Sequence, residues 1–138
     1  MPRRPKSSAP ERLAGARRPA PLRVDAYEFG RITIDGVTYD HDVVVEQETV
    51  RKRRKGPSKP RKAEFGHTPL TADEEIPWKA RRLWVGTGAY GSLPVASDLR
   101  EEARQRGVDL LEKPTPEIVR LINRGLPAET NVILHLTC

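Results

Sequence analysis

The sequence has little of what disulfide-stabilised or membrane-spanning proteins need. Its 138 residues contain one cysteine, Cys138, so an intramolecular disulfide is excluded and nothing favours an oxidising compartment. No apolar run approaches the roughly 20 residues of a membrane helix or the roughly 7 to 15 residues of a signal-peptide core. We therefore expect a cytoplasmic protein with no membrane span.

Periodic apolar residues are also missing from the start of the chain. Residues 1–23 contain five prolines and seven basic residues against one acid, and they cannot bury enough apolar surface to offset the entropy of ordering. The remaining residues are long enough for the core of one domain. We predict a disordered, basic Pro/Arg-rich tail at 1–23 and one folded domain at 24–138.

Acidic residues are absent from residues 51–62, called the basic segment below, although the folded part as a whole is neutral. Residues 24–138 hold 18 basic and 18 acidic side chains, so the net charge of +6 lies in the tail. Two prolines and no apolar side chain predict that the basic segment is an irregular, exposed loop. Its cations are Arg51, Lys52, Arg53, Arg54, Lys55, Lys59, Arg61 and Lys62. The rest of the folded part must carry an equal excess of acids.

A β-hairpin is predicted at the start of the folded part. Residues 27–35 alternate imperfectly between apolar and polar side chains and end in Asp35-Gly36, a dipeptide that tolerates the positive φ of a type I′ turn. The return arm is expected at residues 37–39 and 43–45, with a bend or bulge at His41.

Helices and strands are predicted to alternate after residue 70. Thr71 to Glu74 has the form of a capping box, which predicts a short helix from Ala72 that Pro77 ends. Two βα connections then indicate a partly parallel sheet with helices on it. The expected elements are a strand at 82–85, a helix at 98–106 capped by Ser97, a strand at 108–111, a helix from 115 to 125 and a strand at 132–136.

Three glycines spaced Gly86-x-Gly88-x-x-Gly91 follow the strand at 82–85. The spacing fits the dinucleotide fingerprint, but that fingerprint needs a helix to begin inside the glycine loop so that its N-terminus faces the pyrophosphate. Pro94 and a helix cap at Ser97 displace the helix from the glycines. The glycines are therefore read either as a structural loop or as part of a pocket for a smaller ligand.

The basic segment has three interpretations, two of which involve a binding partner. Phosphates of nucleic acid would release counterions on binding, but the segment lacks interleaved aromatic residues, and Phe65 is the nearest. An acidic protein surface, either the protein's own or that of a partner, is the favoured interpretation, and a solvated run of charge is the third.

Among the histidines, His67 beside the basic segment is the best candidate for a functional side chain. His135 and Cys138 are three residues apart, an offset that places them on opposite faces of a strand, so the pair is read as a packed strand end. No metal site and no cofactor are predicted.

Three motifs resemble the small Mth-type domain family. They are IDGVTYDHD at 34–42, GTGAYGSL at 86–93 and HLTC at 135–138, and they occur in the family's order across residues 24–138. The family includes archaeal and bacterial proteins of unknown function, a protein associated with adipogenesis and a mitochondrial assembly factor of respiratory complex I. The resemblance implies a three-layer α/β domain with a mixed, partly parallel sheet of about five strands and an N-terminal β-hairpin.

The resemblance implies no established enzymatic activity, and it points to assembly or regulation. The leading hypothesis is a non-catalytic binding or assembly module that contacts an acidic protein partner through the tail and the basic segment. The alternatives are a small-molecule or anion-binding protein, with or without chemistry, and a nucleic-acid-binding protein; no oligomeric state is predicted. The candidate ligand-binding residues are Gly86, Thr87, Gly88, Tyr90, Gly91 and His67.

Overall fold

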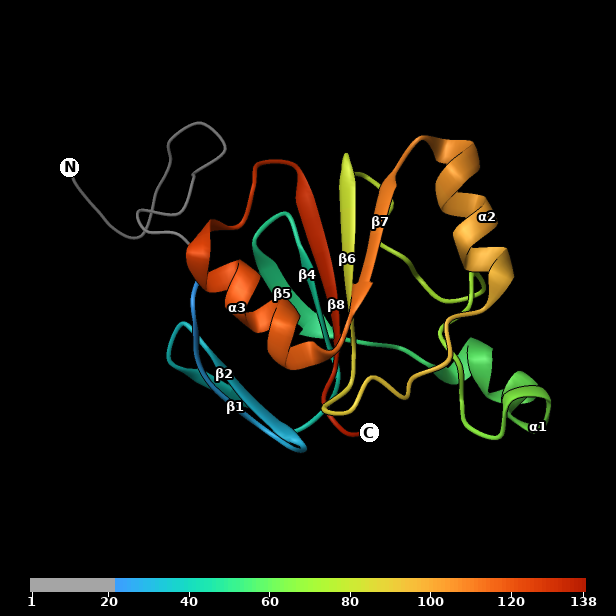
Figure 1. Ribbon diagram of the computed structural model, residues 1–138, viewed down its shortest axis with the longest axis horizontal. Helices are drawn as coiled ribbons and strands as arrows, with labels where there is room; N and C mark the ends of the chain where they lie inside the picture. The colour runs from blue at the N-terminus through green and yellow to red at the C-terminus, as the bar shows by residue number, and fades with distance from the viewer. Residues whose placement is uncertain (1–21) are drawn as a thin grey trace.

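Two β-sheets carry the fold of residues 22–138, which are the residues that the computed structural model describes (Figure 1). The elements in chain order are β1 Val24–Glu28, β2 Arg31–Ile34, β3 Val37–Tyr39, β4 Val43–Glu46, β5 Thr49–Lys52, the 3-10 helix η1 Gly56–Arg61, α1 Lys62–Phe65, β6 Arg82–Thr87, α2 Ser97–Arg106, β7 Asp109–Lys113, α3 Thr115–Gly125 and β8 Thr130–His135. In this part of the chain no helix is long and apolar enough to cross a membrane.

The central sheet is mixed, as predicted. Its strand order is β5-β4-β8-β6-β7, with β6 parallel to both β7 and β8, and with β4 antiparallel to β5 and β8. The parallel pairs are joined through α2 and α3, the helices that the sequence predicts between these strands. This arrangement brings the ends of β6 and β8 to the same edge of the sheet, where the glycine loop and the last residues of the chain meet.

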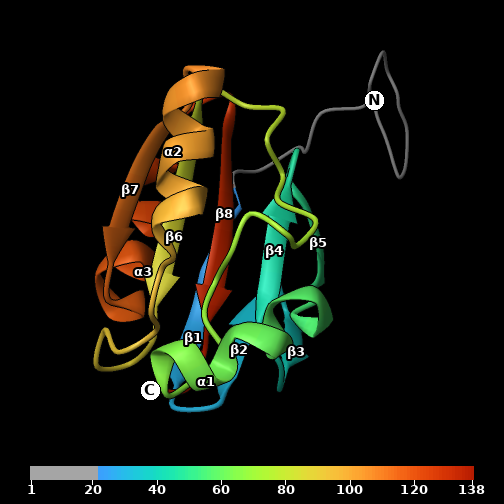
Figure 2. The ribbon, with the colours of Figure 1, turned by 90° about the vertical axis from the view of Figure 1, so that its right-hand side faces the viewer.

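Each face of the central sheet buries its own apolar cluster, which makes the domain three layers thick. Val43 and Val45 point to one face, which is covered by α3 and by the N-terminal sheet, while Val44 points to the other, which is covered by α2. Figure 2 shows α2 in front of the strands and α3 behind them. Buried Ile118 of α3 and Leu99 of α2 anchor the two helices.

The N-terminal sheet contains three antiparallel strands in the order β1-β2-β3. Asp35 (φ 48°) and Gly36 (φ 81°) form the predicted turn with positive φ at both positions. The predicted return arm is wrong in its second half: after β3 the chain leaves this sheet, and residues 43–46 form β4 beside β8 in the central sheet.

The last two residues assigned to the tail belong to the described fold. Leu22 is buried in the core beneath the N-terminal sheet, and the Arg23 N–H donates to Asp35 Oδ1 at 3.0 Å. The folded part therefore begins at least two residues before the predicted boundary. Residues 1–21 of the predicted tail lie outside the described residues.

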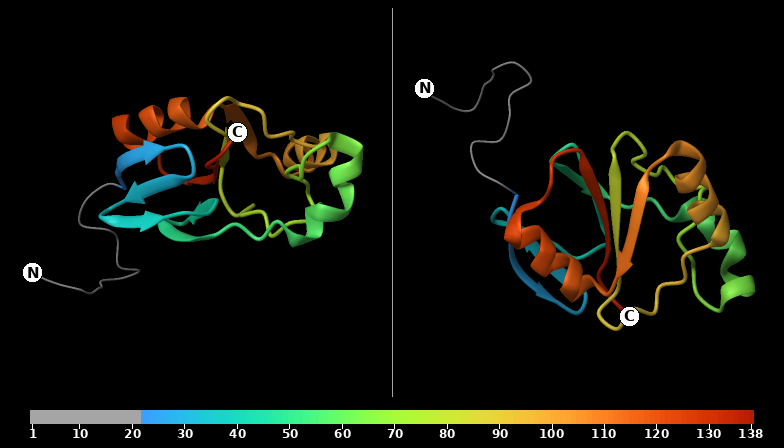
Figure 3. Two further views of the ribbon diagram at one scale, coloured as in Figure 1. Left: turned by 90° about the horizontal axis from the view of Figure 1, so that it is seen from below. Right: turned by 45° about the horizontal axis from the view of Figure 1, so that its top comes forward.

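The basic segment is structured, which corrects the prediction of an irregular loop. It begins in β5, passes through η1 and enters α1, which ends at Gly66 in the left-handed conformation (φ 81°). The helix predicted from Ala72 does not form, because Thr71 Oγ1 accepts the Asp73 N–H in a local turn and the Glu74 side chain points elsewhere. In Figure 3 the N-terminal sheet and the η1–α1 region lie on opposite sides of the last residues of the chain.

Candidate functional site

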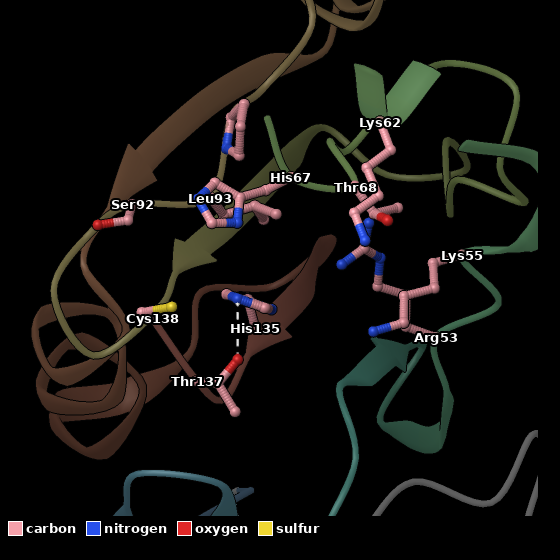
Figure 4. Close-up of a pocket in the computed structure, with 11 residues that line it drawn as sticks. Arg53, Lys55, Lys62, His67, Thr68, Ser92, Leu93, His135, Thr137 and Cys138 are labelled. Carbon is pink, nitrogen blue, oxygen red and sulfur yellow. Dashed lines mark hydrogen bonds between the residues drawn. The ribbon is translucent and has the colours of Figure 1, made fainter. Parts of the chain in front are cut away.

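A pocket opens where the basic segment, the turn after β6 and the end of β8 meet (Figure 4). Its volume is about 190 Å³. The glycine loop lies beside it rather than in it, whereas the predicted candidate His67 is one of its walls. The residues that line the pocket are Arg53, Lys55, Lys62, His67, Thr68, Ser92, Leu93, Pro94, His135, Thr137 and Cys138.

The charged side chains that line this pocket are all cationic. Lys55 precedes η1 and Lys62 opens α1, and neither ammonium group has an ion-pair partner among residues 22–138. Hydroxyl groups of Thr68, Ser92 and Thr137 add neutral donors to the same walls. A pocket that concentrates unpaired positive charge and hydroxyl donors suits an anionic ligand.

Arg53, the third cation at the pocket, is buried and neutralised by the protein itself. Its Nε and Nη2 donate to Glu74 Oε1 and Oε2 at 2.9 and 2.7 Å, and the two side chains are 2% and 3% exposed. Nη1 donates to Asp42 Oδ2 at 2.9 Å. Burial alone would lower the pKa of Arg53, but the hydrogen bonds and charges of Glu74 and Asp42 outweigh it and raise the pKa. Arg53 is therefore a structural cation, not the exposed side chain that the sequence predicts.

Ser58 fastens η1 to the same buried cluster. Its hydroxyl donates to Glu74 Oε2 at 2.6 Å and lies 2.8 Å from Thr71 Oγ1. The capping-box pattern therefore does not mark a helix start here. Thr71 and Glu74 instead form hydrogen bonds with the basic segment, through Ser58 and Arg53. These bonds fix where Lys55 and Lys62 stand.

The other arginines of the basic segment also contact the protein's own acids. Ion pairs join Arg51 to Glu46, Arg54 to Glu75, and Arg61 to both Glu64 and Asp98. The Arg61 guanidinium also lies 5.4 Å from the centre of the Phe65 ring, so this aromatic residue near the segment already has a cationic partner. Part of the excess of acidic residues in the folded part therefore neutralises the arginines of the basic segment.

His135 is held in one orientation by Asp42. Its Nδ1 is 2.7 Å from Asp42 Oδ2, and its Nε2 is 3.2 Å from Thr137 Oγ1 at the pocket wall (Figure 4). The carboxylate also accepts the Leu136 N–H at 2.9 Å through Oδ1. The sequence interpretation of His135 as a packed strand end missed this contact, because its partner is 93 residues away and no local spacing reveals it.

The glycine loop is a structural turn whose N–H groups are used within the chain. The Gly88 N–H donates to Thr115 Oγ1 at 2.9 Å, and the Ala89 and Ser92 N–H groups donate to the carbonyls of Thr137 and Cys138 at 2.7 and 2.9 Å. A loop that binds phosphate needs such N–H groups free. These contacts support the structural alternative for the glycines.

The backbone conformation and the crowding at position 88 both require glycine. The φ of Gly88 is +105°, and a Cβ added to it would lie 2.5 Å from the Cys138 carbonyl oxygen. Gly86 is equally crowded, since a Cβ there would lie 2.7 Å from Thr115 Oγ1. Gly88 therefore permits the close approach of the chain's own C-terminal segment, and Gly86 permits that of Thr115 at the start of α3.

Three remaining candidates of the loop, Thr87, Tyr90 and Gly91, line a separate depression beside α2 and the end of β7. Within it, Arg100 donates to Glu112 through two hydrogen bonds of 2.7 and 2.9 Å. The structure therefore does not bring the glycine loop and His67 into one pocket. Among residues 22–138, no group of three or more His, Cys, Asp or Glu side chains is placed to hold a metal ion.

Solved structures with this fold include relatives from archaea and bacteria. The conserved hypothetical protein PH1505 from Pyrococcus horikoshii OT3 is 27% identical and has a TM-score of 0.72, with 84% of this chain and 99% of that chain covered. The protein MT938 is 24% identical, with a TM-score of 0.63 and coverage of 85% and 99%. A Bordetella pertussis protein described as a Mth938-like domain is 20% identical, with a TM-score of 0.52 and coverage of 83% and 85%.

The comparison with protein families agrees with the similarity to these solved structures. No curated protein matches the chain. A family described as a protein of unknown function, DUF498/DUF598, matches residues 24–136. The predicted resemblance to Mth-type domains is confirmed, and the chain belongs to the DUF498/DUF598 family of proteins of unknown function.

Proposed function

We propose that this protein binds a small anionic molecule, a carboxylate or a phosphate, in the pocket between the basic segment and the end of β8. One observation carries the proposal: Lys55 and Lys62 line a pocket whose charged side chains are all cationic, and neither lysine has an ion-pair partner among residues 22–138. A bound anion would supply the missing counter-charge.

The pairing of the other cations strengthens this interpretation. Four arginines of the basic segment form ion pairs within the chain, so most of their charge is unavailable to an outside partner. Two of the four lysines in the segment stand at the pocket instead. Because Ser58 and Arg53 hold the segment in place, the two ammonium groups are presented without a large loss of backbone entropy on binding.

The test uses inorganic phosphate and succinate as probes in isothermal titration calorimetry at low and high salt. We expect Lys55→Gln and Lys62→Gln each to weaken binding about tenfold, since a charged hydrogen bond contributes roughly 1.5–3 kcal/mol before solvent screening. Lys59→Gln is the matched control, because Lys59 lies on η1 but does not line the pocket. Equal losses in all three variants, or no heat with either probe, would refute the proposal.

A protein-binding module is the second candidate, favoured by an exposed aromatic pair that does not line the pocket. Phe29 and Tyr90 are 55% and 74% exposed, and their ring centres are 6.1 Å apart. Exposed large aromatics are typical of protein interfaces. The tail and the lysines of the basic segment would add electrostatic contacts, as the sequence hypothesis requires. Co-purification from cells near physiological salt tests this candidate, and a partner that is kept by Phe29→Ser/Tyr90→Ser would count against this face.

A further inference from the structure

The wall of the pocket contains a chain of three side chains in which each orients the next. Asp42 bonds His135 Nδ1 at 2.7 Å, and His135 Nε2 lies 3.2 Å from Thr137 Oγ1. Both His135 and Thr137 line the pocket, and Figure 4 shows their side chains pointing toward each other. A hydroxyl within reach of an imidazole that is itself oriented by a carboxylate is the arrangement of a hydrolytic triad.

Asp42 is well suited to orient His135. Its side chain is 10% exposed and accepts further hydrogen bonds from Arg53 Nη1 and the Leu136 N–H, each at 2.9 Å. Burial alone would raise the pKa of Asp42, but the hydrogen bond to His135, the Leu136 N–H and the charge of Arg53 lower it, so the carboxylate is ionised at neutral pH. An ionised carboxylate only accepts hydrogen bonds, which places the proton of a neutral His135 on Nδ1 and leaves Nε2 to accept from Thr137.

We propose that Thr137 and His135 are catalytic residues, positioned by Asp42, and that the protein hydrolyses esters of small anionic acids. This inference rests on the anion-binding function proposed above, with Lys55 and Lys62 holding the anionic end of the substrate.

The reaction balances without a cofactor. Thr137 Oγ forms a bond to the ester carbonyl carbon while its proton passes to His135 Nε2; the ester C–O bond then breaks, and the alcohol leaves with that proton. Water attacks the acyl-threonine, gives its proton to His135 Nε2, and the Thr137 oxygen recovers it as the acid is released. Negative charge on the carbonyl oxygen develops beside the cationic walls of the pocket.

The glycine loop gains a role in this scheme. The Thr137 carbonyl accepts the Ala89 N–H at 2.7 Å, and the Cys138 carbonyl accepts the Ser92 N–H at 2.9 Å. These hydrogen bonds fix the backbone of Thr137, the proposed nucleophile. The loop thus holds the reacting residue in place and does not itself contact the ligand.

The experiment measures hydrolysis of mono-4-nitrophenyl succinate, an ester that carries a carboxylate, with neutral 4-nitrophenyl butyrate alongside it. We expect turnover of the succinate ester in preference to the butyrate ester, a loss of about a hundredfold or more in Thr137→Val and His135→Gln, and recovery in Thr137→Ser. Thr38→Val removes an exposed threonine hydroxyl on the N-terminal sheet and is the matched control for folding and activity. Mass spectrometry of the quenched reaction should find the succinyl group on Thr137.

For Asp42 as a positioning residue, Asp42→Asn should lower kcat while KM changes little, and it should alter the pH profile of kcat. Acylation of Cys138 or a lysine instead of Thr137, or activity that survives Thr137→Val, would overturn the assignment. Succinate binding without hydrolysis would refute the triad and leave the binding function standing. Absence of both binding and hydrolysis would remove the two proposals together.

Discussion

The glycine loop at 86–91 and the basic segment at 51–62 are both bonded to the chain itself, but only the basic segment lines the pocket beside β8. The sequence of the loop allows either a structural turn or part of a small-ligand pocket, and its N–H groups donate to Thr115 and to the carbonyls of residues 137 and 138. The sequence predicts an irregular, exposed loop at the basic segment, yet the segment folds onto Asp42 and Glu74 and forms one wall of the pocket.

The difference shows that a motif is available to a ligand only to the extent that the chain leaves its polar groups unpaired. Backbone N–H groups in a partly buried turn need acceptors, and the C-terminal segment supplies two of them. Arginines beside carboxylates pair within the protein, whereas Lys55 and Lys62 remain unpaired within residues 22–138. The unpaired cations of the pocket therefore lie in the basic segment, and the glycine loop holds residues 137 and 138 in the wall of the same pocket.

Removing Arg53, the buried cation of the basic segment, should cause the largest loss of stability. Arg53→Met leaves the carboxylates of Glu74 and Asp42 buried without their main counter-charge, so we expect a loss of about 3–5 kcal/mol in the free energy of unfolding. Urea denaturation at neutral pH measures it. Arg54→Met is the matched control, because its ion pair with Glu75 is exposed and should contribute within about 1 kcal/mol. Similar losses in both variants would contradict the division between buried and exposed cations.

Local patterns predicted much of the fold. The Asp35-Gly36 turn, the strand before the glycines and the helix that starts at Thr115-Pro116 are all encoded by neighbouring residues, and the structure has them within one or two positions. The mixed sheet follows from these elements because βα units place their strands in parallel.

The site was harder to predict because its pairings span the chain. Asp42 and His135 are 93 residues apart, and Arg53 and Glu74 are 21 apart. Composition gave the number of acids but not which cations they neutralise, so all eight cations were assigned to an exposed loop. The contacts of His135 could not be predicted either, because the register of β4 beside β8 decides its partner.

Crowding the glycine loop should have the next largest effect. Gly88→Ala places a Cβ against the Cys138 carbonyl at a φ of +105°, so we expect a loss of about 2–4 kcal/mol from backbone strain and overlap together. Gly30→Ala is the matched control: its φ is +85°, but no atom lies within 4 Å of the added Cβ, and only the strain of about 1–2 kcal/mol remains. Equal losses in thermal or urea unfolding would show that the contact with the C-terminal segment contributes little.

The smallest expected effect is the acid sensitivity contributed by Asp42, which couples the two regions through His135 and Arg53. The folded-state pKa of Asp42 lies below its ordinary value, so its stabilisation is fully present above about pH 4, where the unfolded aspartate titrates, and is lost as pH falls through the lowered pKa. Asp42→Asn removes this charge and should cost about 1–3 kcal/mol at pH 7, with a smaller difference from the wild type near pH 3.

Urea denaturation of both proteins across this range gives the two curves of stability against pH. They should converge as the wild-type carboxylate becomes protonated, because only the ionised form favours the folded state. Parallel curves would mean that Asp42 acts by shape and neutral hydrogen bonds alone. In that case the charge of Asp42 would not be what holds the proton of His135 on Nδ1, and Asp42 would not link Arg53 of the basic segment electrostatically to the reactive His135.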